Sequence, residues 1–405
     1  MSSASIGPVR RWSMLVLALL STMFTNVFIN GVAFMIPTLH SEHGLDLAAA
    51  GLMASLPSFG MVTTLIAWGY AVDRLGERIV LTSGAALTAA AAGAAASVDS
   101  LLAIGIFLFL GGTAAASSNA ASGRLVVGWF PPHQRGLVMG IRQTAVPLGA
   151  GLGALVIPRL AASEGVAAAL LFPAAICAVS AVLCGVGVLD PPRPTRAQAP
   201  AEHLANPYRS SDGPSTLVRI HAISVLLVVP QALVWTFTLV WLITDRGWTP
   251  AAAGLLVGVA QLLGAAGRVA AGYWSDRVGQ RLRPIRFISL AAAATMGMLA
   301  LTDWLDSPLS IGLMLVASAI TVSDNGLAFT AIAEIAGPFW SGRALGTQNT
   351  SQHLASALSA PLFGGLIGVA GFPAAFLVCA LFPLAAAPLV PVDADPLTHP
   401  RKTDT

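Results

Sequence analysis

The chain has 405 residues, of which 56% are hydrophobic and only 10% are charged. An ordinary soluble domain has roughly 25% charged residues, so this composition excludes that class and indicates a protein that lies in a lipid bilayer. The net charge of +3 is too small to indicate a nucleic-acid partner. Cys177, Cys184 and Cys379 lie in apolar runs without metal-ligand spacing, so we expect neither a disulfide framework nor a metal site.

Segments long and apolar enough to cross a bilayer, which takes about twenty residues, recur along the whole chain. In the first half they cover residues 12–38, 47–72, 79–98, 101–125, 136–160 and 166–189. In the second half they cover residues 217–243, 250–275, 286–303, 308–334, 343–369 and 372–392. We therefore predict an all-α integral membrane protein with twelve transmembrane helices.

The first predicted span carries a polar face. Thr22, Asn26 and Asn30 recur every four residues, so they lie on one side of a helix. Such a face either lines a hydrated binding site or forms hydrogen bonds between packed helices.

The second predicted span ends in a ten-residue motif, Gly69–Arg78, with the sequence GYAVDRLGER. The motif returns after the eighth predicted span as GYWSDRVGQR at Gly272–Arg281, with six of ten positions identical and an offset of 203. A second repeat, with an offset of 206, relates Ser117–Asn119 to Ser323–Asn325. A repeat at half the chain length, flanked by membrane-length segments, indicates a duplicated transporter.

The duplication predicts two six-helix bundles, residues 1–189 and 217–392. Residues 190–216, rich in proline and polar side chains, form the predicted linker, and residues 393–405 form a tail. With the N-terminus in the cytoplasm, most arginines fall at cytoplasmic ends of the spans. We therefore expect both termini, the linker and the tail to be cytoplasmic.

The pattern Gly-x-x-x-Asp-Arg-x-Gly-x-Arg between the second and third spans resembles the signature loop of the major facilitator superfamily. Its return between spans eight and nine is typical of that family, and the resemblance covers nearly the whole chain. It implies two pseudo-symmetric six-helix bundles that move a small solute by alternating access. It also implies that the two loops hold cytoplasmic helix ends together in one conformation and release them in the other. The expected gating residues are Gly69, Asp73, Arg74, Gly76, Arg78, Gly272, Asp276, Arg277, Gly279 and Arg281.

Two charged residues near the predicted cytoplasmic ends of other spans are expected partners of these loops. They are Arg124 in the fourth span and Glu334 in the tenth. The alternative is that these charges serve only to set the topology of the chain.

Two arginines lie inside predicted spans, Arg142 in the fifth and Arg268 in the eighth. A charge at the bilayer centre costs at least about 2.5–3.5 kcal/mol, so each indicates a function. A guanidinium group binds carboxylates through two parallel hydrogen bonds, which favours an anionic substrate. Arg268, four residues before Gly272, also resembles the substrate arginine of monocarboxylate and oxalate carriers. The alternatives are a side chain that reaches the interface, or an ion pair with a loop aspartate such as Asp276.

Asp324 is the one acid placed in the middle of a predicted span. Apolar surroundings favour the uncharged form of a carboxyl group, so Asp324 is the main candidate for proton coupling. His353 in the eleventh span is the second candidate. Alternatively, Asp324 forms a structural ion pair with an arginine, or hydrogen bonds with Asn119 and Asn325.

The other candidates for substrate contact are amides and one aromatic residue. Gln231 and Trp235 share a face of the seventh predicted span. The resemblance implies that spans one, four, seven and ten line a cavity, with the substrate near mid-membrane. The complete expected set is Arg268, Arg142, Asn26, Asn30, Asn119, Gln231, Trp235, Gln348 and Asn349. About half of the polar and aromatic residues in this set, the two arginines excluded, are expected to do no more than join packed helices.

The sequence thus predicts proton-coupled uptake of a small organic anion, with a carboxylate and a proton as partners, by a monomer in the plasma membrane. The alternative is proton-antiport efflux of drugs or amphipathic metabolites. The family's drug exporters usually carry an arginine in span four and a Gly-Pro-x-x-Gly run in span five, and Phe107–Gly112 and Val146–Gly149 do not match these patterns. No phosphate-binding loop, cofactor motif or clustered catalytic set is visible, so we expect neither a cofactor nor an enzyme.

Overall fold

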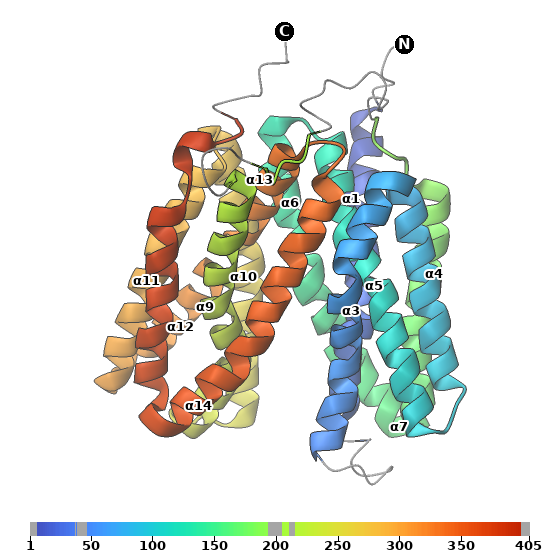
Figure 1. The fold of residues 1–405 in the computed structure, drawn as a ribbon. Helices are drawn as coiled ribbons and strands as arrows, with labels where there is room; N and C mark the ends of the chain where they lie inside the picture. The colour runs from blue at the N-terminus through green and yellow to red at the C-terminus, as the bar shows by residue number, and fades with distance from the viewer. Residues whose placement is uncertain (1–5, 37, 39–46, 193–204, 210–214, 398–405) are drawn as a thin grey trace. The chain divides into compact units, whose positions relative to one another are not determined.

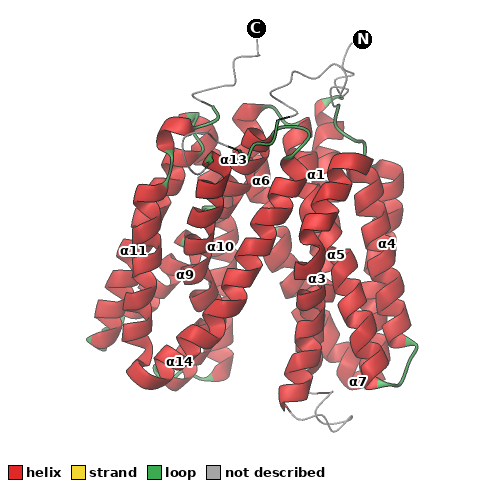
Figure 2. Ribbon diagram, viewed as in Figure 1, coloured by secondary structure: helices red, strands yellow, loops and turns green. Residues whose placement is uncertain are grey.

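The structure is a computed structural model that describes residues 6–36, 38, 47–192, 205–209 and 215–397. Within these residues the regular elements are all helices and no strand is present (Figure 2). Most of the predicted linker and most of the predicted tail lie outside the described residues. In the first half the helices are α1 (Pro8–Gly31), η1 (Val32–Met35), α3 (Leu47–Leu75), α4 (Glu77–Ala96), α5 (Leu101–Trp129), α6 (Pro132–Gln143) and α7 (Ala145–Gly187). In the second half they are α9 (Thr216–Thr244), α10 (Pro250–Val278), α11 (Leu282–Trp304), α12 (Leu309–Ile320), α13 (Asn325–Ala336), α14 (Ser341–Leu389) and η2 (Val392–Ala394).

In the described part of the chain, ten helical segments are long and apolar enough to cross a membrane. Two of them, Pro132–Gly187 with 56 residues and Ser341–Leu389 with 49 residues, are much longer than one crossing. Each contains a glycine with non-helical backbone angles, Gly165 (φ 84°, ψ 176°) and Gly371 (φ 78°, ψ 174°). Only glycine adopts such angles readily. Dividing both segments at their glycine gives the predicted twelve spans, and the predicted boundaries fall beside both glycines.

The tenth predicted span, residues 308–334, corresponds to one membrane-length segment, Leu309–Ala336, but the helix within it is interrupted. Residues 321–324 form a turn that separates α12 from α13. The Thr321 and Ser323 hydroxyls donate to backbone carbonyls four residues earlier, at 2.8 and 2.7 Å. Hydroxyl side chains that bond back in this way compete with the helical ladder and bend helices. The break places Asp324 at the start of α13.

The chain divides into two compact units, each with its own buried apolar core. Unit 1 contains the described residues of Met1–Phe130, Thr144–Ala205 and Gly337–Thr350; unit 2 contains those of Pro131–Gln143, Asn206–Ala336 and Ser351–Thr405. In unit 1, α5 packs against α3 and α4, and α7 packs against α1 and α4 (Figure 1). In unit 2, α10 packs against α6, and α12 packs against α10 and α11. Helix α6 thus belongs to unit 2, although α7, the next helix in the chain, belongs to unit 1. The first turns of α14 belong to unit 1, although the rest of that helix belongs to unit 2.

A buried ion-pair network joins the end of α9 to the end of α11 in unit 2. Arg246 pairs with Asp303, whose side chain is fully buried, and lies 3.4 Å from Asp306. The indole Nε1 of Trp241 donates to Asp303 at 2.9 Å. Burial and the negative charge of Asp303 raise the pKa of the neighbouring Asp245 carboxyl. The network anchors this end of the unit through charge-assisted hydrogen bonds.

Candidate functional site

The first repeated loop binds a helix N-terminus within unit 1. Asp73, near the end of α3, accepts hydrogen bonds from the backbone N–H groups of Gly342 (2.9 Å) and Arg343 (3.1 Å) in the first turn of α14. The Arg343 guanidinium also donates to Asp73, at 2.9 Å. A carboxylate is favoured at this position because it meets unpaired N–H groups and the positive end of the helix dipole. Buried Arg124 lies 3.8 Å from Asp73 and 3.4 Å from Glu77, as expected for a charged partner of the loop.

The second repeated loop does the same within unit 2. Asp276, near the end of α10, accepts from the backbone N–H groups of Gly136 (3.0 Å) and Leu137 (2.8 Å) in the first turns of α6. Gly136 and Gly342 differ by 206 residues, the offset of the second sequence repeat. Both copies of the motif therefore place their aspartate against two backbone N–H groups near the start of a helix from a distant part of the chain.

The first glycine of each motif lets two backbones touch. A Cβ atom on Gly69 would collide with the backbone at Gly342, and one on Gly272 would collide with the backbone at Gly136. Close approach of this kind requires glycine on both sides of the contact. The later glycines, Gly76 (φ 98°) and Gly279 (φ 63°), serve instead to turn the chain.

The last arginine of the motif behaves differently in its two copies, which the presence of arginine at this position in both copies does not reveal. Arg281 is fully buried and pairs with Asp276 (2.6 Å) and Glu334 (3.2 Å). Arg135 of α6 adds a second cation, 3.2 Å from Glu334. Arg78 is exposed, and its side chain donates to the backbone carbonyl of Gly185 at 2.7 Å. Glu334 is therefore a partner of the second loop, as expected, through a buried cluster that has no counterpart at Arg78.

Two acids that the sequence reasoning missed complete these loops. Asp190 accepts from the backbone N–H of Arg78 at 2.8 Å. Buried Asp395 accepts from the backbone N–H groups of Arg281 and Leu282, both at 2.6 Å. The two acids differ by 205 residues and each follows the last span of its half. This offset, close to that of the other repeats, was a signal that could have identified them.

Replacing Arg281 with alanine is expected to lower the free energy of unfolding by about 3–5 kcal/mol, because buried Asp276 would lose its cation and buried Glu334 would keep only the partly exposed Arg135. The matched change, Arg78→Ala, removes one exposed hydrogen bond and is expected to cost about 1 kcal/mol. Unfolding of both variants in the same detergent would measure the difference. Equal losses would contradict the buried cluster.

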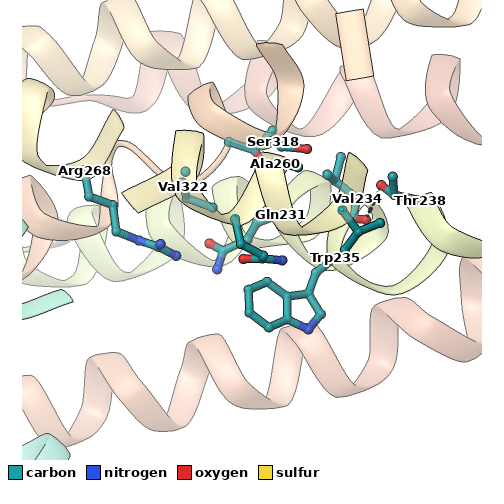
Figure 3. Close-up of a pocket in the computed structure, with 12 residues that line it drawn as sticks. Gln231, Val234, Trp235, Thr238, Ala260, Arg268, Ser318 and Val322 are labelled. Atoms are coloured by element: carbon teal, nitrogen blue, oxygen red, sulfur yellow. Dashed lines mark hydrogen bonds between the residues drawn. The ribbon is translucent and has the colours of Figure 1, made fainter. Parts of the chain in front are cut away.

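Arg268 lines a small pocket in unit 2 (Figure 3). The pocket lies between α9, α10 and α12 and has a volume of about 20 Å³, enough for about one water molecule. Its polar lining includes Gln231, Gln261 and Thr321, and Trp235 forms part of its wall. Figure 3 shows the Arg268 guanidinium directed toward Gln231. The side chain is 4% exposed and forms no hydrogen bond or ion pair with any residue that the structure describes.

Asp324 is the acidic residue that interacts electrostatically with Arg268. Its side chain is 2% exposed, and its Oδ2 atom has no hydrogen-bond partner among the described residues. The two charges interact electrostatically but do not form an ion pair. Asp276, the alternative partner expected for Arg268, is bound to Arg281 and to α6 instead. A buried cation and a buried acid thus lie near one another without neutralising each other directly.

Gln231, the amide expected in the seventh span, takes part in a chain of hydrogen bonds in unit 2. The Asn325 amide donates to the Gln231 carbonyl oxygen at 2.9 Å, and the Gln352 amide donates to Asn325 at 3.2 Å. This chain joins α9, α13 and α14 beside the Arg268 pocket. Gln231 therefore has both a structural contact and a place in the pocket lining.

The other expected substrate residues have local contacts. Asn26, Asn30 and Asn349 each donate to the backbone carbonyl four residues earlier, at 2.8–2.9 Å. The Asn119 amide contacts the sulfur of Met61 at 3.5 Å, and Gln348 is buried.

Arg142 and His353 do not line the Arg268 pocket. Arg142 is buried at the end of α6, where its guanidinium donates to the side chain of Gln143. His353 lies half-buried in α14. Both belong to unit 2.

Comparison with known proteins identifies the family. The family model described as Major Facilitator Superfamily matches residues 15–360. An uncharacterized MFS-type transporter of Mycobacterium tuberculosis is 57% identical over 392 residues, which cover 97% of this chain and 87% of the relative. The gallate transporter of Pseudomonas putida is 26% identical over 422 residues, which cover 93% of this chain and 90% of the relative.

A solved structure shares the fold. The proton:xylose symporter XylE has a TM-score of 0.79 at 17% sequence identity, and the match covers 94% of this chain and 95% of that one. Membership of the family that the repeated loops predicted is thereby confirmed. The family and these relatives are membrane transporters rather than enzymes. The chain belongs to the major facilitator superfamily and is a multi-pass transmembrane transporter.

Proposed function

We propose that the protein takes up a small organic anion together with a proton by alternating access, and that the anion carries a carboxylate. The observation that carries this proposal is the state of Arg268, a guanidinium that is 4% exposed, lines a pocket and has no ion-pair partner in the described part of the chain. An uncompensated buried charge is costly. A carboxylate would compensate it through two parallel charge-assisted hydrogen bonds.

The relatives support this class of substrate. Gallate, named in the Pseudomonas putida relative, is an aromatic carboxylate. The pocket holds about one water molecule in this conformation, so the helices around it must separate during alternating access to admit a ring. The exposed indole of Trp235 in its wall then offers an aromatic surface on which a flat ring would stack. Gln231 and Gln261 supply amide groups for the hydroxyl groups of such a solute.

Asp324 supplies the proton site of this proposal. When Asp324 is ionised it lowers the positive potential at Arg268, and when it is protonated Arg268 attracts an anion more strongly. Binding of the proton and the anion is therefore mutually favourable, as co-transport in one direction requires. His353 and Arg142 are retained as secondary candidates for the proton and the anion.

The two aspartate–helix contacts supply the gate. Asp73 and Asp276 hold α14 and α6 through two backbone N–H groups each. Such bonds at a membrane edge can exchange with water at small net cost. In the proposed arrangement two bundles, residues 1–189 and 217–392, change conformation as a monomer in the plasma membrane. The linker 190–216, the tail 393–405 and both termini face the cytoplasm.

A ligand-stabilisation screen on the purified, detergent-solubilised protein tests the substrate class. We expect carboxylates such as gallate to raise the unfolding temperature, since a ligand present at a hundred times its Kd stabilises the folded state by about 2.7 kcal/mol. The parallel panel contains hydrophobic cations and neutral drugs. Stabilisation by hydrophobic cations alone would contradict uptake of an anion and favour drug efflux.

A further inference from the structure

A second cavity of unit 2 lies on the surface formed by α10, α11 and α12. This groove has a volume of about 490 Å³ and is apolar along most of its lining. Its lining includes Gly267, Ala270, Trp274, Phe287, Ala291 and Ala319. None of its lining residues belongs to the Arg268 pocket. A ligand in the groove would thus be distinct from the transported solute.

The packing of three helices creates the groove. Helix α12 packs against both α10 and α11, whereas α10 and α11 contact each other at few points. Small residues on the facing helices leave the space between them open, and Ala319 forms part of the floor. Trp274 and Phe287 form the walls at one end, with ring centroids 6.1 Å apart. They are 39% and 50% exposed, so a ligand in the groove would contact both rings.

Two arginines continue the groove beyond this aromatic end. Arg277 follows Trp274 by three residues on α10, and Arg283 precedes Phe287 by four residues on α11. Residues at these spacings share a helix face, so both arginines lie one turn further toward the predicted cytoplasmic end. Both are exposed, and neither forms an ion pair with a residue in the described ranges. The Arg277 guanidinium rests over the ring of Tyr273, 5.1 Å from its centroid.

We propose that this groove binds an anionic phospholipid, with an acyl chain between α10 and α11 and the phosphate between Arg277 and Arg283. The volume lies within the ~300–1,000 Å³ range of small-molecule sites. Basic residues beside a crevice between membrane helices, on the cytoplasmic side, are suited to anionic head groups. Aromatic rings at the junction of the apolar and charged parts match the interfacial region of a bilayer.

Native mass spectrometry of the full-length protein tests the site. The protein is given equal amounts of phosphatidylglycerol and phosphatidylcholine with the same acyl chains. We expect the wild type to retain phosphatidylglycerol preferentially. Arg283→Gln is expected to weaken that binding about fivefold, and Arg277→Gln with Arg283→Gln about twenty-five-fold. Arg10→Gln changes an exposed arginine of α1 in unit 1 that does not line the groove; it is the control and should change binding less than twofold.

A second pair of variants tests the apolar part. Ala270→Phe fills the groove and should reduce retention of both lipids, whereas Leu262→Phe adds a ring elsewhere on exposed α10 surface and should not. Unchanged preference for phosphatidylglycerol after loss of both arginines would overturn the proposal. So would normal lipid retention by Ala270→Phe accompanied by loss of a dimer, which would make a second copy of the chain the occupant.

Discussion

Arg268→Ala is expected to abolish uptake of the substrate while leaving the protein folded. Removing one partner of a buried, hydrogen-bonded charge pair costs at least about 2 kcal/mol, so affinity should fall more than about thirtyfold. Arg268→Lys keeps the charge but cannot form the bidentate contact, so it should retain part of the activity. Uptake of gallate and related carboxylates into proteoliposomes measures the effect.

The stability of the same variant provides a control. Arg268 is buried without an ion pair among the described residues, so its removal relieves a desolvation cost. We expect Arg268→Ala without ligand to unfold at the same temperature as the wild type or higher, and to lose stabilisation by carboxylates. This is opposite to the expected behaviour of Arg281→Ala. Wild-type uptake by Arg268→Ala would show that the arginine is structural and that anion binding there is wrong.

Asp324→Asn is expected to lose proton-driven accumulation but to keep exchange of labelled for unlabelled substrate. The amide cannot ionise, so Arg268 remains in one electrostatic state and the pH gradient is uncoupled from binding. One co-transported proton allows about tenfold accumulation for each unit of pH difference. In the variant the accumulation ratio should fall to about one. Uptake driven by an imposed pH gradient and counterflow at equal pH, both in proteoliposomes, measure these two activities.

His353→Gln is the matched control for the proton site. It removes the other titratable candidate without adding charge. If Asp324 carries the proton, His353→Gln should retain pH-driven accumulation. Undiminished accumulation by Asp324→Asn would overturn its role, and loss confined to His353→Gln would transfer the proton site to the histidine.

Much of the architecture follows from the sequence alone. Apolar runs of about twenty residues locate the spans, because a bilayer requires that length and requires backbone hydrogen bonds to be satisfied within each helix. The repeat of Gly69–Arg78 at Gly272–Arg281 identifies the duplication and the family. It also identifies Asp73 and Asp276, whose contacts are the same in both copies because the repeat preserves both the acid and the helix end that it binds.

Local competition for hydrogen bonds decided the break in the tenth span. Hydropathy predicts residues 308–334 as one helix because the whole segment is apolar enough to cross the membrane. At the break the backbone N–H groups of Ser323 and Asn325 bond three residues back rather than four, and the Thr321 and Ser323 hydroxyls bond to nearby backbone carbonyls, which favours a bend. The sequence thus placed Asp324 within a span, and the backbone geometry placed it at a helix start.

Only the tertiary structure decided which charges are paired. Arg78 and Arg281 occupy equivalent positions, yet Arg281 is buried against Asp276 and Glu334 while Arg78 remains exposed. The sequence likewise identified Arg268 as a cation inside a span, but it left open whether the guanidinium forms an ion pair with another residue. The physical reason is that the length and apolarity of a span are local properties, whereas the partner of a charge is set by helices far apart in the chain.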